Sequence, residues 1–171
     1  LRRCWRGQVP WSIGSLPQCW RMGRADISIR DITEIYEIRA CLDELAAGLA
    51  AERITNDELE RLNRLLVEFG QCINAGNMER IVEVDTAFHE VLYTASRNAR
   101  LHSIINNLRE QVTSIRGRSM SYPGRLHDTM NEHRTLVDFI AARDVEGARN
   151  AARSHIENAE HTLMQSISPT I

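Results

Sequence analysis

The sequence is organised around one segment, Val84-Asp85-Thr86-Ala87-Phe88-His89-Glu90-Val91-Leu92-Tyr93. Its apolar residues recur at steps of three and four, which predicts the middle of an amphipathic helix. Asp85 and His89 are one helical turn apart, so their side chains share a face close to the apolar stripe. An inward carboxylate and imidazole need a partner, because an unpaired buried charge is costly. A metal ion would be such a partner.

The bulk composition indicates one globular domain. The chain has 171 residues, of which 43% are hydrophobic and 26% charged, with a formal net charge of -2 and no lysine. The near-neutral charge does not by itself predict nucleic-acid binding. No apolar run suits a transmembrane helix and no signal-peptide core is present, so we expect a cytoplasmic protein without a membrane partner. The cysteines lack a short paired spacing and are expected to be free thiols, namely Cys4, Cys19, Cys41 and Cys72.

Residues 1–24 differ in composition from the rest of the chain. They contain all three tryptophans and five arginines, no acidic residue, and no helical or strand periodicity. One interpretation is a basic arm whose aromatic side chains could contact nucleic acid. The other is a fragment or a poorly ordered tail.

From Asp31 onward the periodicity predicts an all-α bundle of six helices. The expected helices cover about 31–54, 56–75, 78–95, 99–120, 125–143 and 145–166. Thr55 with Glu58, or else Asn56, would cap the second helix, and Asn98 and Asp144 would cap the fourth and sixth. The fourth helix is expected to turn inward Leu101, Ile104, Ile105, Leu108, Val112 and Ile115.

Four polar residues stand where the periodicity predicts apolar ones. Asp85 and His89 are joined by His133 and His155, which lie within the inner stripes of the fifth and sixth helices. A lone histidine on such a face is usually a hydrogen-bonded core residue, but burying four polar groups without a metal would leave donors and acceptors unsatisfied at about 1–3 kcal/mol each. Three imidazoles and one carboxylate suit zinc, nickel, manganese or iron, with an open position for water or a carboxylate.

Arg39 is the other polar residue on an inner stripe, that of the first helix. Its guanidinium could grip the carboxylate of a ligand with two parallel hydrogen bonds, or could form a buried structural salt bridge; the sequence leaves both open. Arg109 and Arg116 are weaker candidates for anion binding and are expected on a flank of the bundle.

Two acidic residues neighbour the candidate ligands. Glu90 and Glu132 either orient the adjacent histidines or lie at the surface. We assign no role to the remaining histidines, His102, His127 and His161.

The chain resembles a known family along a specific set of residues. These are Glu83-Val84-Asp85, Phe88-His89, Leu92-Tyr93, Ala95-Ser96-Arg97-Asn98, Leu101, Glu132-His133 and His155, with Ile38-Arg39 and Ala141-Ala142-Arg143-Asp144 in support. Over about 26–161 the sequence is similar to the FCD effector domain, the C-terminal ligand-sensing domain of FadR-subfamily regulators in the GntR superfamily. The resemblance implies an antiparallel helical bundle that forms a homodimer.

The resemblance also implies a ligand site. A divalent metal, zinc first and nickel or manganese as alternatives, would be held by Asp85, His89, His133 and His155. A small organic acid would bind beside it, and we expect Arg39 and Arg109 to contact that acid.

One departure from the family pattern concerns the N-terminal winged helix-turn-helix domain, for which the chain has no room. Residues 1–24 are expected to be an atypical segment, a remnant or an out-of-frame replacement of the end of that domain. Residues 25–168 are expected to be the FCD-like ligand-sensing domain. Operator DNA would then be bound only through a winged-helix domain that this chain lacks.

The leading functional hypothesis is an effector-sensing domain that is not an enzyme. The alternative is a metal-dependent hydrolase or lyase in which water on a three-histidine, one-aspartate site is the nucleophile. No inward general acid or base stands out beside the four ligands, which disfavours it. A third hypothesis is a metal-stabilised dimerisation module without a ligand. It predicts that Arg39 is paired with protein and does not face an empty polar pocket.

Overall fold

The computed structural model describes residues 27–167 and consists of six helices. They are α1 (Ile29–Arg53), α2 (Asn56–Ala75), α3 (Met78–Ala95), α4 (Ala99–Met120), α5 (Arg125–Ala141) and α6 (Val145–Ile167). Within the described residues there is no strand, so the all-α prediction is confirmed. The interpretations of residues 1–24 lie outside the described part of the chain.

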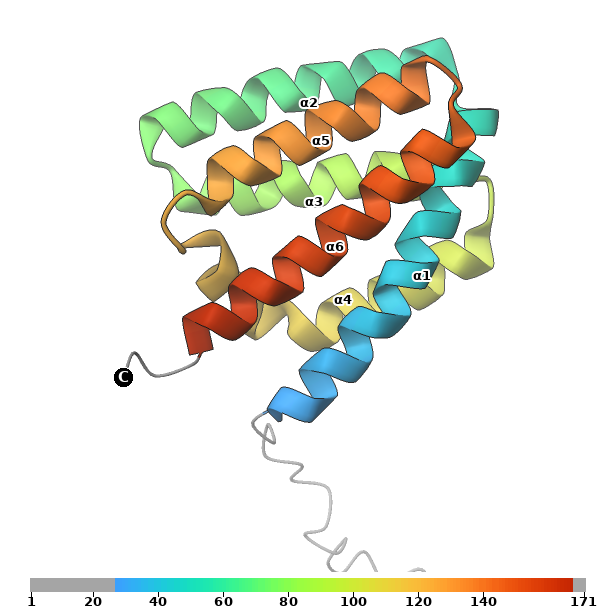
Figure 1. Cartoon of the computed structure of the whole chain (residues 1–171). Coiled ribbons are helices and arrows are strands. Elements are labelled where there is room, and N and C mark those ends of the chain that lie inside the picture. Colours follow the sequence, from blue (N-terminus) through green and yellow to red (C-terminus); the bar gives the residue numbers. More distant parts are fainter. Residues whose placement is uncertain (1–26, 168–171) are drawn as a thin grey trace, which may run out of the picture.

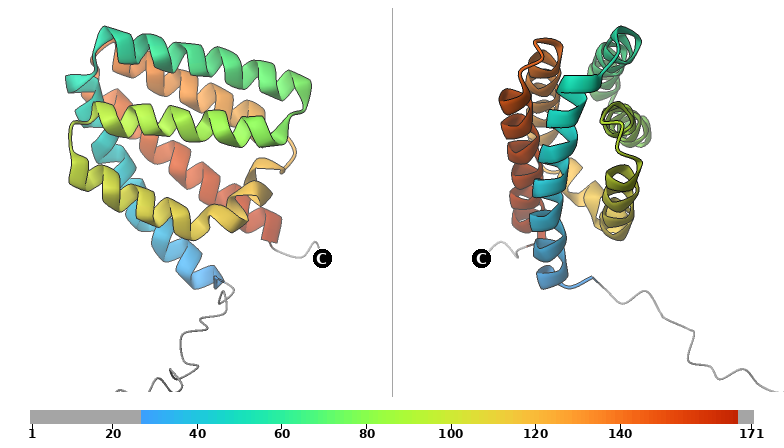
Figure 2. Two further views of the ribbon diagram at one scale, coloured as in Figure 1. Left: turned by 180° about the vertical axis from the view of Figure 1, so that it is seen from behind. Right: turned by 90° about the vertical axis from the view of Figure 1, so that its right-hand side faces the viewer.

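The helices form two layers, seen edge-on in the right-hand view of Figure 2. One layer contains α1, α5 and α6, and the other contains α2, α3 and α4 (Figures 1 and 2). Short connections make α2 and α3, and likewise α5 and α6, antiparallel neighbours. Across the layers, α2 packs on α5 while α1 contacts both α3 and α4. The space between the layers is therefore enclosed by helices that are distant in sequence.

Local hydrogen bonds explain where the helices begin and end. Thr55, and not Asn56, caps α2, through a reciprocal capping box with Glu58. The Asp144 carboxylate accepts a hydrogen bond from the Gly147 amide at 2.9 Å, as expected for the cap of α6. Helix α5 ends before the expected boundary, because Arg143 adopts a left-handed φ of 58°. The predicted boundaries otherwise hold within two residues or so.

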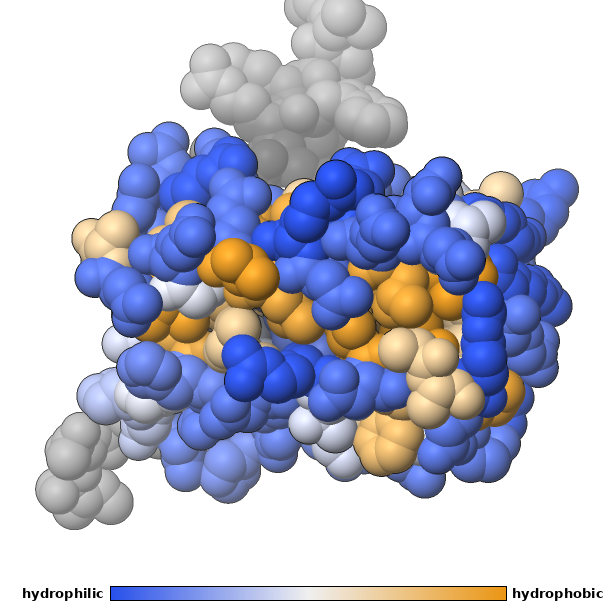
Figure 3. Space-filling view, turned by 90° about the horizontal axis from the view of Figure 1, so that it is seen from above, coloured by the Kyte–Doolittle hydropathy of each residue, from blue (hydrophilic) through white to orange (hydrophobic). Residues whose placement is uncertain are grey.

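Apolar side chains fill the space between the layers, but one prediction for α4 was wrong. Ile104 is 52% exposed, whereas Leu101, Ile105 and Val112 are buried. The apolar stripe of α4 is wider than the surface that its neighbours cover, so the residue at its edge faces outward. Some apolar surface also remains elsewhere, and Figure 3 shows a stripe of it between hydrophilic side chains on the face seen from above.

Two further features bear on the sequence predictions. Cys41 is exposed and Cys72 is buried, and both are free thiols, as predicted. None of the helices in the described residues is long and apolar enough to cross a membrane.

Candidate metal centre

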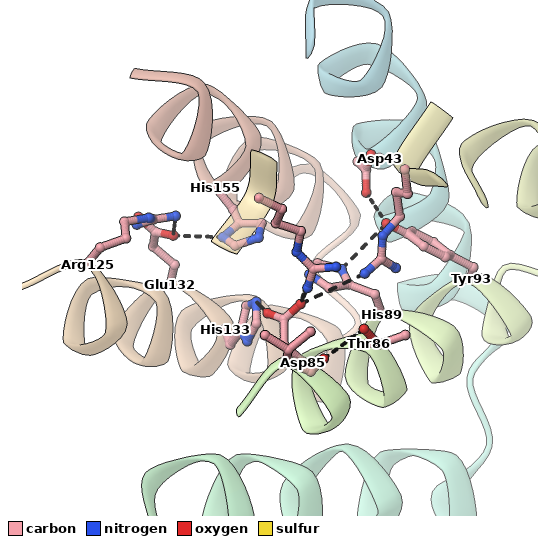
Figure 4. Close-up of polar contacts among 12 residues, drawn as sticks. Asp43, Asp85, Thr86, His89, Tyr93, Arg125, Glu132, His133 and His155 are labelled. Atoms are coloured by element: carbon pink, nitrogen blue, oxygen red, sulfur yellow. Dashed lines mark hydrogen bonds and ion pairs between the residues drawn. The ribbon is translucent and has the colours of Figure 1, made fainter. Parts of the chain in front are cut away.

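Three histidines from three helices meet between the layers. His89 of α3, His133 of α5 and His155 of α6 point toward one another in Figure 4, and one potential ligand atom from each lies within 4.8 Å of the others. All three side chains are buried, and His133 is only 1% exposed. The fold therefore brings together the three histidines that the sequence singled out.

Burial makes these histidines neutral at neutral pH. It lowers the pKa of His89, His133 and His155 below the ordinary value of 6.5. The nearby Arg109 guanidinium lowers the pKa of His89 further. A neutral imidazole is the form that binds a metal ion, so these groups need not lose a proton first.

Glu132 orients His155. Its carboxylate lies 2.7 Å from His155 Nδ1 and accepts two hydrogen bonds from Arg125, at 2.7 and 2.8 Å. Burial alone would raise the pKa of Glu132, but hydrogen bonds from His155 and Arg125 lower it to about 2. Because an ionised carboxylate only accepts hydrogen bonds, Nδ1 of His155 carries the proton and Nε2 is left free. Glu132 thus orients a histidine, but this is His155 of α6 and not the adjacent His133 that the sequence had suggested.

The other residues with open interpretations lie at the surface. Glu90 is exposed and its carboxylate is 3.0 Å from His102 Nε2 on α4. His127 and His161 are also exposed. None of these side chains reaches the three buried histidines.

His133 and His89 have different surroundings. The His133 ring stacks on Phe88 with ring centroids 4.2 Å apart. His133 Nε2 is buried without a hydrogen-bond partner among the described residues. His89 Nδ1 lies 3.5 Å from the Tyr93 hydroxyl. An imidazole nitrogen buried without a partner suits a metal ligand, because a bound metal would compensate for the hydrogen bonds to water that the nitrogen loses on burial.

Asp85 lies between the histidines and a group of arginines. Its Oδ1 is 3.8 Å from His133 Nε2 and its Oδ2 is 3.8 Å from His89 Nε2. The same carboxylate forms a close ion pair with Arg116 and has Arg109 at 3.9 Å. The prediction that Arg109 and Arg116 lie on a flank of the bundle was therefore wrong, because both side chains point inward. The buried Asp85 carboxylate supplies the counter-charge that makes this placement possible.

A small cavity opens beside the histidines on the arginine side. Its volume is about 40 Å³, and its lining includes Tyr36, Arg39, Arg109, Arg116, Ser119 and Thr129. Around it, three guanidiniums outnumber two carboxylates, namely Arg39, Arg109 and Arg116 against Asp43 and Asp85. The remaining guanidinium of the lining, Arg125, is balanced by Glu132. This space is large enough for a few water molecules and is positively charged.

The position of Arg39 agrees in part with both interpretations, a ligand-binding guanidinium and a buried salt bridge. Arg39 lines the cavity, and its Nε is also 3.5 Å from Asp43 Oδ2 on the same helix. Asp43, Tyr93 and Arg125 had no role assigned from the sequence alone. The four-residue spacing of Arg39 and Asp43 was a usable signal for the first of these, but the contacts of Tyr93 and Arg125 depend on helix packing.

Comparison with known proteins identifies relatives of this chain. The family model for the FCD domain matches residues 34–158. The chain is 25% identical over 142 residues to the uncharacterized HTH-type transcriptional regulator YdhC of Bacillus subtilis, covering 80% of this chain and 63% of that protein. It is 29% identical over 131 residues to the HTH-type transcriptional regulator McbR of Escherichia coli, covering 73% of this chain and 58% of McbR. The chain thus spans about three fifths of the length of these curated relatives.

Solved structures agree with this relationship. The structure of E. coli McbR/YncC superposes with a TM-score of 0.73 at 27% identity, covering 82% of this chain and 71% of that one. Streptococcus agalactiae GntR shares the fold, with a TM-score of 0.67 at 24% identity over 77% of this chain and 59% of its own. The relatives are regulators, so they do not support the hydrolase or lyase alternative. The chain belongs to the FCD domain family, and the relatives YdhC and McbR are named as transcriptional regulators and not as enzymes.

Proposed function

We propose that this chain is the metal-containing effector-binding domain of a GntR-type regulator, and that it senses a small organic acid. The observation that carries the proposal is the junction of two groups of residues. Three buried, neutral histidines converge beside a cavity, and two of them, His89 and His155, line it together with an excess of guanidinium groups. The first group suits a divalent metal ion and the second suits an anion.

The residues present fit a metal ion. His89, His133 and His155 would hold it, and His133 Nε2 is a buried nitrogen that otherwise lacks a partner among residues 27–167. Asp85 would be the fourth ligand, since one of its oxygens faces His133 while the other faces Arg109 and Arg116. Zinc is the first candidate and nickel or manganese are alternatives. When bound, such an ion would supply a Lewis-acid position for a carboxylate oxygen.

The arginines support an acidic effector. Each guanidinium can donate two parallel hydrogen bonds to a carboxylate. Arg39, Arg109 and Arg116 are not fully neutralised by the two carboxylates near them, and a divalent metal would add further positive charge. The limited volume of the cavity favours a small acid. Because Arg39 faces this space, sensing is better supported than the metal-stabilised module without a ligand.

Regulation would follow from a difference in affinity. An acid shifts an equilibrium between two helix arrangements only as far as it binds one of them more tightly. In the complete regulator, a winged-helix domain would bind operator DNA and a homodimer would present two such domains. We propose both partners from the family relationship of the chain.

Metal analysis of the purified chain, combined with a thermal-shift screen of carboxylic acids, tests the proposal. We expect about one ion per chain, and an acid that raises the melting temperature only when metal is present. Chelated protein serves as the control. Protein that neither retains nor rebinds zinc, nickel or manganese, and whose melting is unaffected by every acid, would refute the proposal.

A further inference from the structure

Arg39 and Asp43 form an incomplete ion pair on α1. Both are buried, with 5% and 2% of their surfaces exposed. The Nε of Arg39 and the Oδ2 of Asp43 are 3.5 Å apart, and neither atom has a hydrogen-bond partner among the described residues. A hydrogen bond between them would be about 0.5 Å shorter. Asp43 thus balances the charge of Arg39 without occupying its donors fully.

Tyr93 holds Asp43 in this position. Its hydroxyl, which comes from α3, donates a hydrogen bond to Asp43 Oδ1 at 2.5 Å, and Figure 4 shows the two side chains pointing toward each other. The tyrosine hydroxyl is the donor in this bond, because an aspartate carboxylate only accepts hydrogen bonds. The aspartate is therefore tied to α3 by one oxygen while its other oxygen faces Arg39.

The two residues stand differently with respect to the cavity. Arg39 belongs to its lining, whereas Asp43 does not. A ligand carboxylate in the cavity would reach the guanidinium from a space that Asp43 does not line. Because a guanidinium presents several donors in a rigid plane, an acid that aligns with it forms two short bonds that Asp43 does not form.

We propose that Asp43 is a resident competitor for Arg39, restrained by the Tyr93 hydroxyl, and that it sets the affinity of the cavity for an organic acid. The inference rests on the proposed acid-binding function. A bound acid exchanges the long Arg39–Asp43 contact for short hydrogen bonds to Arg39. Occupancy of the cavity is thereby transmitted to α1, the helix that carries both residues.

Two substitutions test the competition with opposite expected signs. Asp43→Asn keeps an oxygen for the Tyr93 hydroxyl but removes the competing charge, so acid affinity should rise about fivefold or more. Tyr93→Phe releases Asp43 toward Arg39, so acid affinity should fall by a similar factor. The matched control is Glu44→Gln, at an adjacent position whose carboxylate pairs with Arg153, and it should leave the affinity unchanged.

The measurement is isothermal titration of the zinc-loaded full chain with acetate, succinate and citrate, with zinc content and circular dichroism recorded for each variant. If an acid binds the wild type and binds Asp43→Asn with equal or lower affinity, this inference is wrong while the proposed function stands. If no acid binds the wild type or either variant, both fail. Should Asp43→Asn not fold, Tyr93→Phe decides, because unchanged or tighter acid binding with full zinc content contradicts the competition.

Discussion

Two polar networks meet at the three histidines and differ in how completely their hydrogen bonds are made. We call them the α5–α6 network, comprising Arg125, Glu132, His155 and Asn158, and the arginine side, comprising Arg39, Asp43, Asp85, Arg109 and Arg116. Every contact of Glu132 in the first lies between 2.7 and 2.9 Å. In the second, apart from the close Asp85–Arg116 ion pair, the contacts of Arg39 with Asp43 and of Arg109 with Asp85 are 3.5 and 3.9 Å.

We propose that this difference separates residues that position a histidine from residues that bind an anion. Buried polar groups without a hydrogen bond cost about 1–3 kcal/mol each, so a fold keeps them where something else is gained. In the α5–α6 network the hydrogen bonds of Glu132 are made, and they position His155. On the arginine side some guanidinium N–H groups lack a short hydrogen bond, and an anion site requires such donors. The comparison predicts that substitutions in the two networks affect different measurements.

The largest effect is expected from His133→Ala, which removes the junction itself. Metal binding should fall by more than the roughly 10- to 100-fold typical of losing a supporting residue, because we propose His133 as a direct ligand. Metal titration measures this. His161→Ala, which removes an exposed histidine bonded to Gln165, is the control and should bind metal normally. Equal metal binding by both variants would rule out His133 as a ligand.

Acidification is expected to have the next largest effect, on the metal-free protein. Since burial lowers the pKa of His89, His133 and His155 below 6.5, the unfolded chain binds more protons than the folded one below that pH. The contribution of these histidines to the free energy of unfolding is fully present above pH 6.5. It is lost as the pH falls from 6.5 toward their lowered pKa values in the folded protein. Three such groups would cost up to about 3 kcal/mol between roughly pH 6.5 and 5.5. Urea unfolding across this range tests it, and a flat profile would contradict neutral buried histidines.

Glu132→Gln tests the α5–α6 network separately from the arginine side. Removing the charge that orients His155 is expected to lower metal affinity by about 10- to 100-fold. The variant also leaves the buried Arg125 without its carboxylate, so stability should fall. Glu90→Gln is the matched control, because Glu90, like Glu132, is adjacent in sequence to a candidate ligand but lies at the surface. Metal affinity that is unchanged in Glu132→Gln would show that the α5–α6 network is structural only.

Arg39→Gln should show the complementary pattern to Glu132→Gln. It should weaken acid binding and leave metal binding unchanged. Loss of a charge-assisted contact costs about 1.5–3 kcal/mol, which corresponds to roughly 10- to 150-fold weaker acid binding. Zinc content should stay the same. Arg153→Gln, which affects an arginine paired with Glu44 away from the cavity, provides the control. A loss of zinc without a change in acid affinity would reverse the roles assigned to the two networks.

The smallest effect is expected from Arg97→Gln. Arg97 grips Glu58 at 2.7 and 2.8 Å, the same two distances as between Arg125 and Glu132. The Arg97 side chain is exposed and screened by water, whereas Arg125 is buried, so loss of the Arg97 pair should change the melting temperature little. Arg125→Gln, compared in the same thermal melts, should be far more damaging. Similar losses in both would mean that burial does not distinguish the two pairs.

Much of the site could be predicted from local sequence. Helical periodicity placed Asp85, His89, His133 and His155 on inner faces, because a helix turns at a fixed rate and an inward polar residue interrupts an apolar stripe. The same reasoning located Arg39. Thr55, one of the two caps expected for α2, was likewise a local feature, and the structure confirms it.

What the sequence could not decide depends on which helices become neighbours. Glu132 pairs with His155, 23 positions later, only because α5 and α6 pack at that register. Arg109 and Arg116 point inward because Asp85 of α3 offers them a buried counter-charge, whereas Ile104 faces outward because no helix covers it. Periodicity identifies the inner face of each helix from that helix alone. The partners of those inward residues on neighbouring helices follow from tertiary packing. Tertiary packing therefore also decides the difference between the fully hydrogen-bonded α5–α6 network and the incompletely hydrogen-bonded arginine side.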